Sequence, residues 1–189
     1  MFRMKAGSSS LQISGGSVID KQSLNSMITL QPGVHWEMSQ FSSRLGIHYL
    51  QELGGPYGLT TVSGIGISGY YYLRGISTTY SIPMEGTVIQ KSIPGPFLYG
   101  GVTPINFNVN KIDATNSSQS FYASSFVLDV AAGIGYDYTI SNNMILSAEL
   151  LIRNAAGSGD SGGAKGKAGE SGLSYRGFSF MLSYATTYY

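Results

Sequence analysis

The chain has 189 residues, only 11% of them charged, and a formal net charge of +1. So small a charge leaves no basic surface for nucleic acid, and the lack of cysteine excludes a disulfide framework, a thiolate metal site and a cysteine nucleophile. The 26 glycines and 14 tyrosines argue against disorder, which goes with few aromatic residues and much charge.

The start of the chain alternates apolar and polar residues, the pattern of a strand whose two faces meet different surroundings. Expected strands cover residues 2–6, 28–38 and 41–53, with a polar glycine- and serine-rich link over residues 9–25. No apolar run approaches the roughly 18–20 residues of a transmembrane helix. No signal peptide is recognisable, so we expect a mature form with an added or retained Met1.

Glycine dominates the middle of the chain, where the alternation is weaker. Residues 54–69 are predicted to form a long glycine-rich loop, and a fourth strand is predicted near residues 70–84. Residues 85–95 are predicted to form a turn and residues 97–109 a fifth strand. The polar residues 110–121 break the alternation and are predicted to form a loop.

The clearest pattern lies in residues 126–152 and predicts a β-hairpin. Every second residue over 126–140 is apolar, a turn of serine and asparagine follows, and the apolar alternation resumes over residues 144–152. The strands exceed the usual length of about 5–6 residues. The second face carries small residues or whole charges, such as Asp129 and Glu149. Such side chains suit the crowded interior of a narrow barrel, so the apolar face is predicted to meet lipid.

A polar loop over residues 155–174 and a last strand over residues 178–184 bring the expected strands to eight. Long connections are expected near residues 9–25, 54–69, 110–121 and 155–174, with short turns between the other strands. This asymmetry is typical of transmembrane β-barrels, whose sheet must close because hydrocarbon offers the backbone no hydrogen-bond partners. The predicted fold class is all-β: a closed eight-stranded antiparallel up-and-down transmembrane β-barrel, as a single domain over residues 1–189.

With the apolar faces outward, a set of polar and charged side chains faces the lumen: Arg3, Lys5, Gln31, His35, Glu37, Arg44, His48, Glu52, Asp129, Asp137, Glu149 and Arg153. Enclosed charges without partners are costly, so these residues are predicted to form a hydrogen-bonded ion network that fills the narrow bore. The alternative is a narrow pore or small-solute channel. Aromatic residues near strand ends are candidates for the membrane interface: Trp36, Tyr49, Tyr72, Tyr80, Tyr138 and Tyr184.

Several segments together resemble a known family: FVLDVAAGIGYDYTISNNMILSAELL, YSIPM, PFLYGG and the terminal FSFMLSYATTYY. They resemble the small eight-stranded outer-membrane proteins of Gram-negative bacteria, the OmpA/OmpX-type or porin-like β-barrel family, over essentially the whole chain. The resemblance implies a bacterial outer-membrane protein in contact with the lipid bilayer and lipopolysaccharide. A monomer is expected, with a structural or surface-recognition (adhesion) role and a macromolecule at the extracellular loops as a conceivable partner.

No catalytic residue, cofactor or metal site is predicted. Barrels of this kind that deacylate lipid A place a His and a Ser two residues apart on the lipid-facing side. Here the residue two positions after His35 is Glu37, and the residue two positions after His48 is Leu50. Both histidines also have inward parity. Two ligands such as His48 and Glu52 are too few for a metal site, and the glycine runs lack the strand–loop–helix context of a phosphate loop.

A soluble lipocalin-like ligand carrier is the second alternative. Its apolar face would line the interior and its charged face would meet water. The Gly-x-Trp signature of that family is missing around Trp36, which follows Val34 and His35. The two readings therefore differ in which face of each strand points inward.

Overall fold

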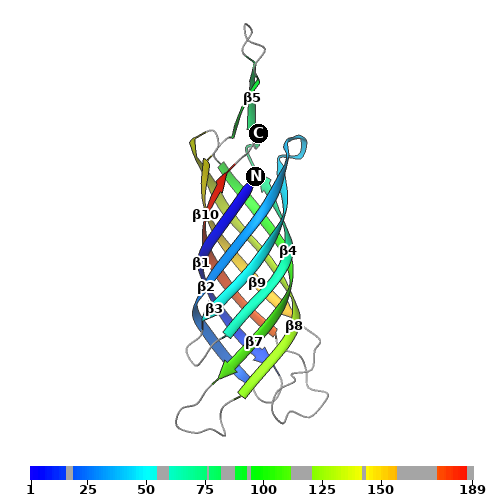
Figure 1. Ribbon diagram of the computed structural model, residues 1–189, viewed down its shortest axis with the longest axis vertical. Helices are drawn as coiled ribbons and strands as arrows, with labels where there is room; N and C mark the ends of the chain where they lie inside the picture. The colour runs from blue at the N-terminus through cyan, green and yellow to red at the C-terminus, as the bar shows by residue number, and fades with distance from the viewer. Residues whose placement is uncertain are drawn as a thin grey trace.

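Figure 1 shows the computed structural model, a tall barrel of tilted strands with both chain termini at one end. The structure describes residues 1–15, 19–54, 60–75, 77–81, 88–92, 95–111, 121–141, 144–156 and 174–186. Eight strands form the barrel: β1 (Phe2–Gly15), β2 (Ile19–Met38), β3 (Ser43–Gly54), β4 (Thr60–Tyr72), β7 (Gly95–Lys111), β8 (Phe121–Ser141), β9 (Met144–Ala156) and β10 (Ser174–Thr186). They pair antiparallel in the order β1-β10-β9-β8-β7-β4-β3-β2, and β1 also pairs with β2. The predicted closed eight-stranded, antiparallel, up-and-down barrel is confirmed.

The register between the strands fixes the tilt of the barrel. A path along paired residues starts at Phe2 on β1, passes through every strand and returns to β1 at Gln12, ten residues further along. Such a stagger across eight strands corresponds to a tilt of about 40°. A barrel of this size has an interior that side chains can fill.

The outward face is an apolar band. On β8 every outward residue from Phe126 to Tyr138 is apolar or aromatic, and the series ends at Ile140. These fourteen steps span about 35 Å of height at the tilt above, enough for a hydrocarbon layer of about 25–30 Å. Leu150 is 52% exposed, whereas its neighbour Glu149 is 1% exposed. A carrier with an apolar interior is incompatible with this arrangement.

The two ends of the barrel differ. The terminal end, where both chain termini lie (Figure 1), carries the short 3₁₀ helix η1 (Ser39–Phe41) between β2 and β3. At the far end the outward positions are polar on several strands: Ser8, Ser10, Gln12, Thr61, Ser63, Asn106, Asn108, Asn154 and Arg176. The barrel wall therefore continues beyond the apolar band as a polar extension. Among the described residues, none belongs to a helix long and apolar enough to cross a membrane.

The prediction for the middle of the chain was wrong. The predicted loop over residues 54–69 is mostly strand β4, which pairs with β3 and β7 along its length. Glycines on both faces of β4 blur its alternation, but they fit the fold because large side chains lie against them. A Cβ at Gly66 would lie 2.3 Å from Thr103 Oγ1, and one at Gly64 would lie 2.8 Å from Ile105 Cγ2.

The predicted fourth strand near residues 70–84 is also corrected. Only its first residues belong to β4; Ser77–Ser81 forms β5, which pairs with β6 (Val88–Ser92) in a separate two-stranded sheet. The predicted turn over residues 85–95 therefore contains a strand. Figure 1 shows this hairpin standing beyond the barrel at the terminal end. The connection between β4 and β7 is thus long, contrary to the expected short turn.

The polar link predicted over residues 9–25 was also wrong. β1 continues to Gly15 and β2 begins at Ile19, so most of this segment is paired strand. Among the side chains of this segment that the structure describes, Ser10 and Gln12 lie in the polar extension of the wall, and the buried Ser9 hydroxyl binds partners inside the barrel. The loops predicted over residues 110–121 and 155–174 lie almost wholly outside the described residues.

Candidate functional site in the barrel lumen

Strand alternation places the predicted polar residues inside the barrel. The following are buried: Arg3, Lys5, Gln31, His35, Arg44, His48, Glu52, Asp129, Asp137, Glu149 and Arg153. Glu37 differs, because it lies at the terminal mouth where β2 ends and its side chain is 27% exposed. The buried residues divide into two ionic clusters with a neutral layer between them.

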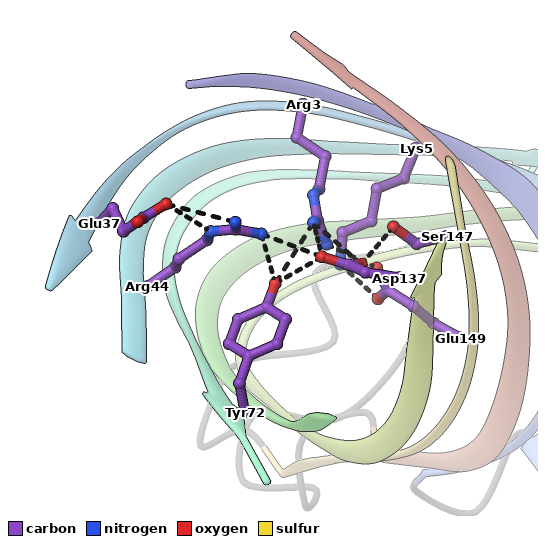
Figure 2. Close-up of polar contacts among 8 residues, drawn as sticks. All are labelled: Arg3, Lys5, Glu37, Arg44, Tyr72, Asp137, Ser147 and Glu149. Atoms are coloured by element: carbon purple, nitrogen blue, oxygen red, sulfur yellow. Dashed lines mark hydrogen bonds and ion pairs between the residues drawn. The ribbon is translucent and has the colours of Figure 1, made fainter. Parts of the chain in front are cut away.

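Figure 2 shows the terminal cluster, which consists of Arg3, Lys5, Glu37, Arg44, Tyr72, Asp137, Ser147 and Glu149. Its centre is the Asp137 carboxylate on β8. Asp137 pairs with Arg3 Nη2 at 3.0 Å and with Arg44 Nη1 at 2.9 Å. The hydroxyls of Tyr72 and Ser147 also donate to it. The donors come from β1, β3, β4 and β9, so their charge-assisted hydrogen bonds to the carboxylate on β8 join five strands across the lumen.

The other carboxylates of the terminal cluster complete its charge balance. Glu149 accepts from Lys5 Nζ at 2.6 Å and lies 3.4 Å from Arg3 Nη1. Glu37 pairs with Arg44 at 3.3 Å. Three cationic side chains therefore face three carboxylates. Such closely paired charges offset part of the cost of burying them.

Aromatic rings fill the space beneath the terminal cluster. The guanidinium of Arg3 lies 4.6 Å from the ring centre of Tyr70, and Lys5 Nζ lies 4.2 Å from that of Tyr99. Tyr70 also meets Phe97 and Tyr99 edge-on at centroid distances of 5.3 and 5.2 Å. These cation–π and edge contacts hold the cations in fixed positions.

The neutral layer is built around the two histidines. His48 Nε2 lies 2.9 Å from Thr103 Oγ1, and His48 Nδ1 lies 3.3 Å from Ser68 Oγ. His35 Nε2 approaches the same Ser68 hydroxyl at 3.4 Å. Both histidines are thus in hydrogen-bond contact with hydroxyl groups of β4 and β7.

The distal cluster, nearer the far end, consists of Ser9, Thr29, Glu52, Asp129, Arg153 and Tyr175. Its centre is the Arg153 guanidinium, which donates to Glu52, to Asp129 at 2.8 Å and to the Tyr175 hydroxyl at 2.9 Å. Glu52 Oε1 also accepts from the hydroxyls of Ser9 and Thr29, each at 2.8 Å. Here one cation serves two buried carboxylates.

Apolar side chains pack around the distal cluster toward the far end of the lumen. This apolar plug consists of Leu11, Met27, Leu50, Val62, Ile105, Phe107, Val127 and Ala155, and the ring of Tyr175 packs with them. Phe107 and Tyr175 contact each other at a centroid distance of 5.6 Å. The interior therefore contains an apolar region in addition to the predicted polar residues.

The predicted interface aromatics fall into three groups. Trp36, Tyr49, Tyr138 and Tyr184 point outward, between 40% and 63% exposed. Tyr72 was wrongly assigned to the interface, because β4 has the opposite parity and its hydroxyl binds Asp137 inside the barrel. Tyr80 lies on β5 outside the barrel, and its side chain is not among those described.

Sequence reasoning also missed lumen residues that complete the network. Ser147, Tyr70, Tyr99 and Tyr175 all contact charged side chains. Ser147 and Tyr175 have inward parity in their strands, so the alternation of the sequence could have identified them as lumen residues. Tyr70 required the correct placement of β4. Among the described residues, no group of three or more His, Asp or Glu side chains is arranged to hold a metal ion.

An outward apolar band around a filled, ion-paired lumen defines the chain structurally as an eight-stranded barrel of the outer-membrane type. Among solved structures, it is similar to the crystal structure of Neisserial surface protein A (NspA). The match has a TM-score of 0.54 at 13% sequence identity and covers 98% of this chain and 97% of that protein. This similarity shows a shared fold. No protein-family model matches the sequence, and no curated protein matches it.

Proposed function

We propose that the chain is an integral outer-membrane protein without catalysis, whose closed barrel presents a surface for recognition or adhesion. The observation that carries the proposal is the division of side chains between an apolar outer face and an enclosed ionic interior. In water an outer band of Leu, Ile, Phe and Tyr would be an exposed apolar patch far larger than monomers tolerate. In a bilayer the same band is the favourable arrangement.

The interior favours a structural barrel over a channel. The terminal cluster crosses the lumen through Asp137, and the distal cluster crosses it through Arg153. The apolar plug adds side chains such as Phe107, which is fully buried. A conducting path would have to break several buried ion pairs, each costly to separate. We therefore expect conductance in planar bilayers to be absent or rare.

The polar extension supports a role at the cell surface. Outward residues such as Gln12, Asn106 and Asn154 suit water rather than lipid, so the far end is proposed to project from the membrane. The structurally similar NspA is, by its name, a Neisserial surface protein. The terminal end, with the β5–β6 hairpin, would then lie on the periplasmic side.

Fluorescence from single tryptophans tests the membrane placement. Trp36 is the only tryptophan of the chain and is 56% exposed on the outer face. In vesicles of brominated lipid its emission should be quenched. In a Trp36→Phe background, Ile134→Trp at the middle of the band should be quenched most strongly, and by bromines deep in the acyl chains. Asn106→Trp in the polar extension should respond to aqueous iodide instead. Equal quenching of all three positions by iodide would contradict the proposal.

A further inference from the structure

A small cavity of about 20 Å³ lies between the neutral layer and the distal cluster. Its lining includes Gln31, Asp129, Arg153 and Ser179. A volume of this size holds about one water-sized particle. The lining residues face the lumen, so the barrel wall separates a particle in the cavity from lipid.

Two buried oxygen atoms in this lining have no bonding partner within the part of the chain that the structure describes. They are Asp129 Oδ1 and Ser179 Oγ, and the residues are 2% and 1% exposed. The other carboxylate oxygen of Asp129 is already engaged with Arg153 Nε and Nη2. A buried acceptor left unpaired is costly, so a ligand in the cavity that contacts these two atoms would offset that cost.

The charges around the cavity indicate the sign of that ligand. Arg153 is shared by Glu52 and Asp129, and its remaining donor contact goes to the neutral Tyr175 hydroxyl. The described residues of the distal cluster therefore carry one surplus negative charge. Lys5, another cation of the lumen, pairs with Glu149 in the terminal cluster.

We propose that the cavity binds one monovalent cation of about the size of water. Asp129 Oδ1 and Ser179 Oγ are its protein ligands, and the Gln31 amide lies in the same lining. Carboxylate and hydroxyl oxygens suit hard cations. The one surplus negative charge of the distal cluster matches one positive charge rather than two. The cation neutralises the distal cluster and completes the interior packing.

Thallium(I) in crystals and potassium in solution test the proposal. Crystals of the full chain soaked in thallium(I) should show an anomalous peak in the cavity beside Asp129 Oδ1. Barrels refolded from urea in potassium chloride should unfold about 3–6 °C higher than those refolded in choline chloride at equal ionic strength, the shift expected at a cation concentration about tenfold above its dissociation constant.

Two variants and a matched control make the test specific. Asp129→Asn should abolish both the peak and the potassium shift. Ser179→Ala removes a ligand without changing charge and should reduce the peak and the shift, which keeps the test decisive if Asp129→Asn does not fold. Ser183→Ala removes another buried hydroxyl of β10, outside this cavity lining, and should retain both. An unoccupied or water-filled cavity in thallium crystals, or equal shifts in Ser179→Ala and Ser183→Ala, would overturn the proposal.

Discussion

The terminal and distal clusters use the same residue types in opposite roles. At the terminal end a carboxylate, Asp137, sits at the centre and receives two guanidinium groups. In the distal cluster a guanidinium, Arg153, sits at the centre and serves two carboxylates. The first cluster is balanced in charge once Glu37 at the mouth is included, whereas the second carries a negative surplus.

The difference lies in how many alternative ion-pair partners each buried charge has. If Asp137 is lost, Arg3 still reaches Glu149 and Arg44 still reaches Glu37. If Arg153 is lost, neither Glu52 nor Asp129 keeps a cationic partner among the described residues. Breaking a buried pair is costly mainly because of the uncompensated charge left behind. The two centres should therefore respond unequally to substitution.

The largest effect is expected from Arg153→Met, which keeps the bulk of the side chain but removes its charge. Two carboxylates are then left enclosed, and we expect the free energy of unfolding at neutral pH to fall by about 3–5 kcal/mol. Urea titration in lipid vesicles, followed by tryptophan fluorescence, measures it. Arg176→Met on the exposed face of β10 is the matched control and should change stability by less than about 0.5 kcal/mol.

Acidification separates the charge effect of Arg153→Met from a packing effect. Carboxylates can take up protons and become neutral, whereas guanidinium groups keep their charge. The stability gap between Arg153→Met and the unmodified protein should therefore narrow as the pH is lowered. A gap that stays constant with pH would mean that lost packing, not enclosed charge, causes the destabilisation.

A smaller effect is expected from Asp137→Asn, the same kind of change at the terminal centre. Its arginine partners retain other carboxylates, so the cost should be about 1.5–3 kcal/mol, the range for lost hydrogen bonds to charged groups. Glu52→Gln, which removes a surplus charge in the distal cluster, is the control and should cost less. A larger cost for Glu52→Gln would contradict the assigned charge balance.

The sequence predicted the fold and most of the lumen because alternation is a strong signal where one face is uniformly apolar. In β8 and β9 the outward series is unbroken, so the inward positions of Asp129, Asp137, Glu149 and Arg153 followed directly. Register could not be read in this way. The meeting of Arg3 with Asp137, 134 positions apart in the chain, depends on the stagger between strands, and so does the separation into two clusters.

The sequence misplaced β4 for an equally physical reason. Strand Thr60–Tyr72 carries glycines on both faces, at positions where neighbouring side chains approach the backbone closely. Its own residues therefore show little alternation, and only the side chains of the neighbouring strands explain why it forms a strand. The β5–β6 segment has the opposite property, since its apolar alternation resembles a barrel strand although it pairs only with itself. Parity carried forward from this wrong segment placed Tyr72 on the outside.

The smallest effect is expected from replacing residues 77–92, the β5–β6 hairpin, by a short glycine–serine linker. The hairpin leaves the barrel just after Tyr72 of the terminal cluster, and Tyr72 and Phe97 remain paired across β4 and β7 at its base. A two-stranded sheet alone is marginally stable in water and contributes no barrel pairing, so the free energy of unfolding should change by less than about 0.5 kcal/mol. Asp137→Asn should cost the same with and without the hairpin, because distant independent changes add. If Asp137→Asn lowered the free energy of unfolding more in the shortened chain than in the full chain, the hairpin would support the terminal cluster. The alternative partners of that cluster would then include residues outside the barrel wall.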